Sequence, residues 1–223
     1  LETERRFFAE AAHELRTPLA VLSAQAHVVA NESSERGRRE ALAALEAGIE
    51  RSGRVVGRLL TLARLDAPPP PDTFAPLDAG GLAEEIASAL SARAAASGHA
   101  LELAASDPVI LEGSEEALRA ALENLVDNAL RYTPPGTTIK LSVRRLGDEC
   151  VIEVADDGPG IAPALHDRVF GRFERLGRQG GDGTGLGLAI VRRVAEIHGG
   201  QAEFRPGPDG RGCLFRLRLP IGG

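Results

Sequence analysis

The sequence predicts a helical hairpin followed by an α+β sandwich, in which helices lie over one face of a mixed sheet. Two apolar seams with heptad-like spacing fill residues 1–66, and mixed helical and alternating patterns run from residue 77 onward. With 223 residues, the chain has room for one large domain or two small ones. We therefore expect two units, residues 1–66 and 77–223, joined by a linker over residues 67–76.

The first unit is expected to consist of two antiparallel helices. The first seam contains Phe8, Ala12, Leu15, Leu19, Leu22, Ala26 and Val29, and the second contains Leu42, Leu45, Ile49, Val56, Leu59 and Ala63. Between them, residues 31–37 (NESSERG) supply cap and turn residues for the reversal. Two helices cannot bury such narrow stripes alone, so we expect two hairpins to pair as a homodimeric four-helix bundle.

The proline-rich stretch APPPPDTFAP, residues 67–76, separates the two units, because consecutive prolines stop a helix and form a semi-rigid spacer. Beyond it, helices are expected over residues 81–95, 114–132 and 186–198. Strands are expected near residues 100–104, 109–112, 138–145 and 150–156, and two more flank a turn at residues 207–210. The middle helix carries its core stripe on Leu118, Leu122, Leu125 and Ala129.

Composition narrows the class of protein. The net charge of -6 argues against a general nucleic-acid or anionic-membrane binder, because both favour a basic surface. Cys150 and Cys213 stand far apart without nearby ligand partners, which fits two thiols in a reducing compartment. The sequence has no apolar run of membrane-spanning length and no signal peptide. Because it starts at Leu1 and lacks Met, we interpret it as a piece of a longer protein.

His13, in FFAEAAHELRTPLA, falls just outside the first seam, so its imidazole should be accessible. An uncharged imidazole is a competent nucleophile near neutral pH, and Glu14 can accept the proton of one ring nitrogen. Thr17 lies one turn later on the same face, and Pro18 should bend the helix there. Taken alone, the pattern is better explained by solvated helix residues beside a proline kink.

A polar stripe of Asn124, Asn128 and Arg131 runs beside the core stripe of the helix expected over residues 114–132. Amide oxygens are suitable ligands for Mg²⁺, and an arginine on the same stripe can bind phosphate. The alternative is a solvated helix face, although such faces usually carry more Glu and Lys than Asn. Before its context is considered, the stripe supports both interpretations equally.

Asp156 ends an expected strand in phase with Ile152 and Val154, so it should point toward the covered face of the sheet. A buried carboxylate needs hydrogen-bond donors, and the amino group of adenine is one candidate. Gly158 and Gly160 follow, and glycines permit the backbone to approach a ligand closely. The alternative is a tight turn with an aspartate cap.

A second glycine-rich stretch, GDGTGLGLAI, places Gly183, Gly185 and Gly187 at the start of an expected helix. Free N–H groups and the helix dipole favour a bound phosphate there, rather than a plain flexible loop. The spacing fits neither a Walker A loop nor a Rossmann fingerprint. Residues 161–184 lie between the two glycine stretches and have the length and glycine content of a mobile lid or of a surface loop.

The order of these motifs resembles that of the sensor histidine kinases of bacterial two-component systems. HELRTPL resembles their H box, ENLVDNALRYTP the N box, DDGPG the first glycine box, VFGRFERLG the F box and GTGLGL the second glycine box. The resemblance covers roughly residue 5 to the end. It implies a HisKA-type dimerisation and phosphotransfer hairpin over residues 1–66, followed by an ATP-binding sandwich of the GHKL/Bergerat type over residues 77–223.

Position by position, the resemblance implies that His13 accepts the phosphoryl group, Glu14 activates it, and Thr17 acts in dephosphorylating the partner protein. Asn128 would bind Mg²⁺, and Asn124 would support the transfer geometry.

For the ATP site, the resemblance implies that Asp156 reads the adenine. The other expected ATP-binding residues are Asn128, Arg131, Tyr132, Gly158, Gly160, Ile161, Phe173, Arg175, Gly183, Thr184, Gly185, Leu186 and Gly187. The F box departs from the family pattern at Gly171 and Glu174, where an acidic residue and an aromatic are common, which leaves the lid contacts of Arg175 open.

The activity that the resemblance implies is ATP-dependent autophosphorylation of His13, phosphotransfer to an aspartate of a response regulator, and dephosphorylation of that regulator. ATP and Mg²⁺ would be the cofactors, and a second copy and the regulator would be the partners, with no nucleic acid. The chain would be the cytoplasmic portion of a receptor that segments upstream anchor in the inner membrane. The alternatives are a GHKL ATPase or serine kinase, a nucleotide-binding dimeric scaffold, and a phosphatase-dominant protein.

Overall fold

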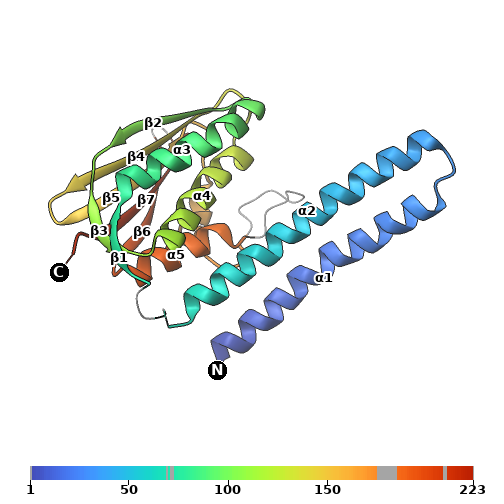
Figure 1. The fold of residues 1–223 in the computed structure, drawn as a ribbon, viewed down its shortest axis with the longest axis horizontal. Coiled ribbons are helices and arrows are strands. Elements are labelled where there is room, and N and C mark those ends of the chain that lie inside the picture. Colours follow the sequence, from blue (N-terminus) through green and yellow to red (C-terminus); the bar gives the residue numbers. More distant parts are fainter. Residues whose placement is uncertain (1, 69, 71–72, 175–184, 208–209, 223) are drawn as a thin grey trace.

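The computed structural model describes residues 2–68, 70, 73–174, 185–207 and 210–222. It begins with two long antiparallel helices, α1 (Glu2–Asn31) and α2 (Glu35–Asp66), which form the hairpin in Figure 1. The reversal is shorter than expected, because Ser34 caps α2 by accepting a hydrogen bond from the Gly37 N–H at 3.0 Å. Residues 35–37 are therefore already helical. Within the described residues, no helix combines the length and apolar character needed to cross a membrane.

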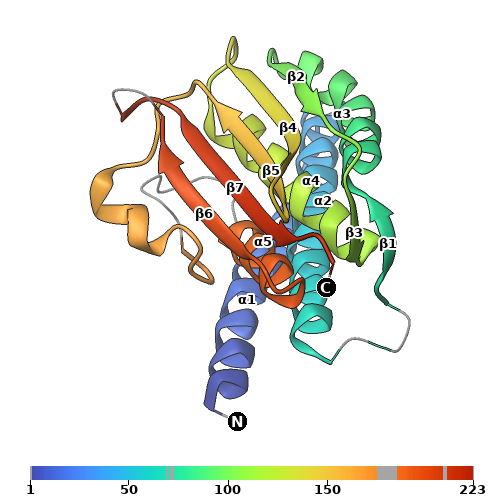
Figure 2. The ribbon, with the colours of Figure 1, turned by 90° about the vertical axis from the view of Figure 1, so that its left-hand side faces the viewer.

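The second unit is built on a five-stranded mixed sheet in the order β2-β4-β5-β7-β6. Its strands are β2 (Ala100–Ser106), β4 (Thr138–Leu146), β5 (Glu149–Asp156), β6 (Gln201–Pro206) and β7 (Cys213–Pro220). Only the β2–β4 pair is parallel. Three helices, α3 (Ala79–Ala96), α4 (Glu115–Tyr132) and α5 (Gly187–Ile197), cover one face of the sheet (Figures 1 and 2). The predicted α+β sandwich is confirmed.

Two short elements depart from the expectations. Strand β1 (Ala75–Asp78) includes Ala75 and Pro76, which were expected to belong to the linker. It pairs with β3 (Ile110–Gly113) in a separate two-stranded sheet. This small sheet forms because Leu77 and Leu111 pack into the common core. A 3₁₀ helix, η1 (Pro163–Arg168), lies in the stretch that was expected to be a lid.

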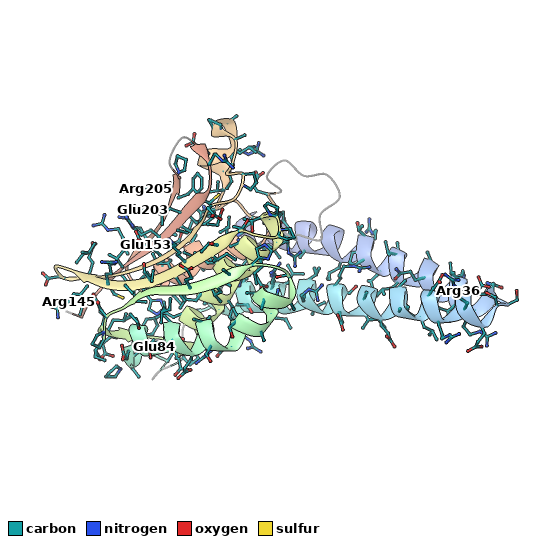
Figure 3. All side chains as sticks on the ribbon, turned by 90° about the horizontal axis from the view of Figure 1, so that it is seen from above. Arg36, Glu84, Arg145, Glu153, Glu203 and Arg205 are labelled. Atoms are coloured by element: carbon teal, nitrogen blue, oxygen red, sulfur yellow. The ribbon has the colours of Figure 1, made fainter. Side chains whose placement is uncertain are left out.

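Strand β7 shows why only one face of the sheet is covered. Its side chains alternate, with Phe215 and Leu217 buried toward the helices and Arg216 and Arg218 pointing to the other face. On that face, the Arg216 Nε donates to Glu153 at 2.7 Å, and the Arg218 Nε donates to Glu149 at 2.9 Å. Figure 3 shows the charged side chains of this open face. A ligand that needs enclosure must therefore bind on the helical side.

The hairpin is docked on the second unit through the last turns of α2, which lie against α5 (Figure 1). Leu59 and Leu62 are buried and belong to the same core as the sandwich. At the end of α2, the Asp66 carboxylate pairs with Arg172 at 2.8 Å and with Arg193 at 3.3 Å. Apolar contact and ion pairs together fix the position of this helix.

We predict that Leu122→Ala lowers the free energy of unfolding by about 2–5 kcal/mol, because Leu122 is fully buried between α4 and the sheet and the change leaves a cavity. Urea denaturation followed by circular dichroism measures this loss. Leu146→Ala is the matched control, since Leu146 is 57% exposed at the end of β4 and its truncation should change stability by less than about 0.5 kcal/mol. Equal effects of the two substitutions would contradict the described core.

Candidate nucleotide site

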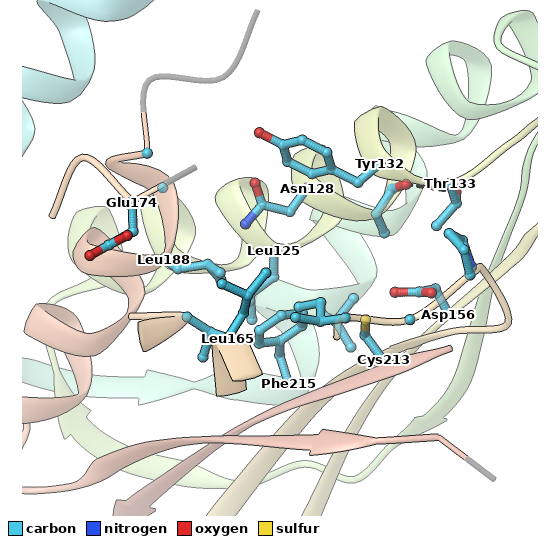
Figure 4. A pocket seen from close by; sticks show the side chains of 18 of the residues that line it. Leu125, Asn128, Tyr132, Thr133, Asp156, Leu165, Glu174, Leu188, Cys213 and Phe215 are labelled. Carbon is cyan, nitrogen blue, oxygen red and sulfur yellow. Dashed lines mark hydrogen bonds between the residues drawn. The ribbon is translucent and has the colours of Figure 1, made fainter. Parts of the chain in front are cut away.

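A cavity of about 210 Å³ opens between α4, the end of β5, η1 and the start of α5 (Figure 4). Its polar groups include Asn128 and Tyr132 on α4 and Asp156 at the end of β5. The apolar part of its wall is formed by Leu125, Val154, Leu165, Val169, Leu188 and Phe215. An apolar slot with a few polar groups at its rim is a typical site for a flat ring that carries a polar tail.

Helix α4 places its asparagines by helical periodicity, because its core stripe is buried and the adjoining stripe turns toward α5. The Asn124 Nδ2 donates to the Ala120 carbonyl at 2.7 Å, whereas the Asn124 Oδ1 is buried without a hydrogen-bond partner. A Cβ atom on Gly187 would lie 3.0 Å from the Asn124 Oδ1 and 3.5 Å from the Asn128 Oδ1. Both amide oxygens therefore face the first turn of α5.

This pair of oxygens suits a small hard cation bound together with a phosphate. Amide oxygens are good ligands for Mg²⁺, and an orphaned buried oxygen such as the Asn124 Oδ1 gains most from a partner. The described residues contain no group of three or more His, Cys, Asp or Glu side chains that could hold a metal by themselves. A cation here would thus depend on amide oxygens, ligand phosphates and water.

Asp156 lies across the cavity from α4 (Figure 4). Burial raises the pKa of its carboxyl group, and hydrogen bonds from the Gly158 and Cys213 N–H groups oppose this rise. The neighbouring Asp157 has a structural contact instead, because its Oδ1 accepts the Thr138 N–H at 2.8 Å. Asp156 is therefore the carboxylate that is available to a ligand, as its strand phase predicted.

The first glycine stretch is shaped by close packing. A Cβ atom on Gly158 would lie 2.5 Å from the Thr133 Cγ2, and the Thr133 hydroxyl is held by the Ala129 carbonyl at 2.7 Å. Gly160 has a φ of 76° and passes so close to the Gly210 carbonyl that a Cβ atom would lie 2.5 Å from that oxygen. Gly160 and Ile161 line the cavity, whereas Gly158 stands behind Asp156.

The second glycine stretch is described only from Gly185 onward, so Arg175, Gly183 and Thr184 lie outside the described residues. Gly185 and Gly187 line the cavity, and Leu186 is fully buried just before α5. Among the described residues, no side chain caps the start of α5, and Gly185 and Gly187 leave room for a ligand to approach its first turn. Phe173 does not line the cavity.

The remaining predicted residues are placed as follows. His13, Glu14 and Thr17 lie in α1, where Thr17 is exposed and the side chains of His13 and Glu14 lie outside the described part. Tyr132 lines the cavity, and Arg131 is half-buried on α4 with a buried Nη1 that has no hydrogen-bond partner.

Sequence reasoning did not assign much of the cavity wall, and four of the residues that it missed have polar or aromatic side chains of particular interest. Cys213 and Phe215 share the inward phase of β7, and this alternation is a signal that could have identified them. Burial, followed by the charge of Asp156, raises the pKa of the Cys213 thiol to about 12, so the thiol is neutral. Glu174 also lines the wall, and its carboxylate is held by the Arg168 Nη2, which donates to the Oε1 at 2.7 Å and to the Oε2 at 2.8 Å. The fourth, Arg58, comes from α2 of the hairpin, and nothing in its local sequence indicates this position.

The helix-covered sheet, its apolar slot with Asp156, and the amide oxygens facing a helix start together define an ATPase-type nucleotide-binding domain joined to a helical hairpin. Residues 113–223 match the family of histidine kinase-, DNA gyrase B- and HSP90-like ATPases, and residues 3–68 match the His Kinase A (phospho-acceptor) domain. The chain belongs to the bacterial two-component sensor histidine kinases.

The sequences and structures of several sensor kinases are similar to this chain. The chain is 36% identical to the swarming motility regulation sensor protein RssA of Serratia marcescens, over 98% of this chain and 47% of RssA. It is also 36% identical to the sensor protein kinase PmrB of Pseudomonas aeruginosa, over 99% of this chain and 46% of PmrB. The structure of full-length ShkA in complex with AMPPNP has a TM-score of 0.70 and 31% identity, over 97% of this chain and 46% of ShkA. The chain thus spans about half the length of these relatives.

We predict that Asp156→Asn weakens ATP binding about 10- to 100-fold. The carboxylate accepts a hydrogen bond from the adenine amino group, whereas the amide that replaces it can turn its NH₂ group, a second donor, toward the adenine. The substitution should leave the melting temperature unchanged or slightly higher. The raised pKa means that ionised Asp156 opposes folding, so its contribution to stability falls as pH rises from the unfolded pKa through the folded one. Isothermal titration calorimetry and thermal denaturation at neutral pH measure the two effects. Unchanged ATP affinity would contradict the role of Asp156.

Proposed function

We propose that this chain binds ATP in the cavity, transfers the γ-phosphoryl group to His13 and then passes it to an aspartate of a response regulator. The observation that carries the proposal is that one chain joins a phospho-acceptor hairpin to a nucleotide cavity, with the hairpin packed against the unit that contains it. The proposed division is a hairpin over residues 1–66, a linker over residues 67–76 and an ATP-binding unit over residues 77–223.

In this proposal, the Asp156 carboxylate accepts a hydrogen bond from the amino group of adenine, and the apolar wall of the cavity packs against the adenine ring. Gly185 and Gly187 let the start of α5 approach the phosphates, whose charge its free N–H groups stabilise. Asn128, supported by Asn124, would hold Mg²⁺, which neutralises phosphate charge when bound. Of the other expected residues, Arg131 would contact phosphate, and Gly183 would complete the phosphate cradle with Gly185 and Gly187. Tyr132, Gly160 and Ile161 would contact the nucleotide from the cavity wall, and Gly158, Phe173 and Leu186 would support that wall from outside the lining. Arg175 and Thr184 are the remaining residues that we expect to bind ATP.

On the hairpin, a ring nitrogen of His13 would attack the γ-phosphorus of ATP while Glu14 accepts the proton of the ring, and the bond to the β–γ bridging oxygen would break to release ADP. Because phosphoryl transfer depends on positioning and charge neutralisation, the hairpin and the nucleotide unit must meet in one arrangement. The Pro-rich linker would permit that rearrangement. Thr17, exposed one turn after His13, would act in dephosphorylating the regulator.

We further propose that two copies pair through the hairpin. Several seam residues that were expected to be buried are exposed in the single chain, with Leu19 at 59%, Ile49 at 56%, Val56 at 42% and Leu42 at 41%. An apolar stripe of this kind along two long helices matches what a four-helix bundle buries. In the whole protein, segments upstream would anchor this part on the cytoplasmic side of the inner membrane.

We expect the chain with Mg²⁺ and γ-labelled ATP to acquire an acid-labile, base-stable label, as a phosphohistidine does. His13→Gln removes the acceptor and should abolish the label while leaving ATP affinity unchanged. Asn128→Ala should reduce labelling by at least about 100-fold, because the cation ligand is lost. Label stability in acid and base, followed on gels, is the measurement. ATP binding without label in the unmodified chain would contradict the kinase proposal and favour a scaffold or a phosphatase.

We expect Ile49→Asp to convert a dimer into a monomer, because a charge on the exposed seam would be buried without a partner in the bundle. Light scattering coupled to size-exclusion chromatography gives the mass. Glu50→Asp, at the exposed neighbouring position, is the control and should remain dimeric. A monomeric unmodified chain at tens of micromolar would contradict the dimer proposal.

A further inference from the structure

Arg58 is a hairpin residue that lies in the wall of the nucleotide cavity. It belongs to α2, yet it lines the cavity together with Asn128 and Tyr132 of α4. Its side chain is only 13% exposed, and its Nη2 donates to the Asp127 Oδ2 at 3.4 Å. The cavity is therefore composed of residues from both units, and the hairpin contributes a cation to it.

The charges around Arg58 are not balanced. Asp127 is shared, because its Oδ1 also pairs with Arg93 at 2.7 Å. Arg131 stands one helical turn after Asp127, and its Nη1 is buried without a hydrogen-bond partner. Burial lowers the pKa of Arg58, the positive charge of Arg131 lowers it further, and the negative charge of Asp127 opposes this. Two guanidinium groups, those of Arg58 and Arg93, therefore share the Asp127 carboxylate, and Arg131 adds a third positive charge nearby.

An anion at the cavity would relieve this imbalance. Guanidinium groups bind phosphate with charge-assisted hydrogen bonds, and two arginines that converge from different helices form a clamp for it. The long, weak contact of Arg58 with Asp127 leaves hydrogen-bonding capacity for a ligand in the cavity that Arg58 lines. Arg131 does not line the cavity itself, but its Nη1 is buried without a hydrogen-bond partner among the described residues. The polar tail of a nucleoside triphosphate supplies such an anion at this cavity.

We propose that Arg58 is a phosphate ligand which the hairpin supplies to the nucleotide site, acting together with Arg131. The inference rests on the proposed ATP binding in this cavity and goes beyond it, because it makes nucleotide affinity depend on the docked hairpin. ATP then bridges the two units, and its phosphates hold α2 against α4.

The hairpin geometry gives this contact a place near the proposed acceptor. A Cβ atom on Gly48 of α2 would lie 2.5 Å from the Gln25 side chain of α1, so these positions face each other. Ten residues further along α2 and ten residues back along α1 lead to Arg58 and Leu15, and Leu15 is less than one turn from His13. Arg58 thus lies at about the same level as His13 along the hairpin axis.

The test is nucleotide binding to the whole chain. We expect Arg58→Gln to weaken ATP binding about tenfold, the loss of one charge-assisted hydrogen bond, and to leave adenosine binding unchanged. Arg58→Lys should recover part of the ATP affinity. The matched control is Arg54→Gln, one turn earlier on α2 at an exposed position, which should bind ATP as the unmodified chain does. Isothermal titration gives the ATP affinity, and competition gives that of adenosine.

Asp127→Asn separates phosphate binding from a purely structural docking role. If Arg58 only docked the hairpin through Asp127, Asp127→Asn and Arg58→Gln would weaken binding alike, for adenosine as well as ATP. We expect Asp127→Asn instead to keep or increase ATP affinity, because it removes an anion that competes for Arg58. Equal ATP affinity of the unmodified chain and Arg58→Gln would overturn the inference. Failure of the unmodified chain to bind ATP would overturn the proposed function itself.

Discussion

The packing of α4 against the sheet is the constraint on which the site depends. Leu118, Leu122 and Leu125 must lie on the sheet, and the helical period then fixes the direction of every other side chain on this helix. Asn124 and Asn128 face the start of α5 because they adjoin this apolar stripe. A helix rotated by one residue would bury the asparagines and expose the leucines, at a cost of several kcal/mol.

The docking of α2 depends mainly on apolar contact. Full burial of a leucine such as Leu62 contributes about 1.5–3 kcal/mol, whereas a partly exposed pair such as Arg193–Asp66 contributes about 1 kcal/mol or less. The ion pairs therefore determine which orientation is adopted more than how tightly the helix is held. A contact of this strength is compatible with a hairpin that leaves and returns during a reaction cycle.

Much of the sandwich could be predicted from sequence because its elements have strong local signals. The helices over residues 81–95 and 114–132 follow apolar periodicity, and Asp156 continues the alternation of Ile152 and Val154 in β5. Strand β1 could not be predicted in this way, because it is four residues long, contains Pro76 and exists only through pairing with β3, more than thirty residues away. Tertiary contact, rather than local propensity, determines such an element.

The cavity shows the same division between local and distant information. Asn128, Asp156, Gly185 and Gly187 could be predicted because each belongs to a local motif whose chemistry is specific. Arg58 is one of many arginines on a solvated helix, and its role arises only when α2 packs on a unit that begins some twenty residues later. A local pattern does not contain that placement.

Helix α2 carries two adjoining apolar stripes, one exposed and one buried. Ile49 and Val56 of the predicted seam stay exposed, whereas Leu59 of the same seam is buried with Leu62 in the common core. These stripes adjoin on one rigid helix, so a rotation of α2 that repacks the seam also shifts Leu59 and the neighbouring Arg58. Because Arg58 lines the cavity, a displacement of α2 would also move the guanidinium group that this helix contributes there.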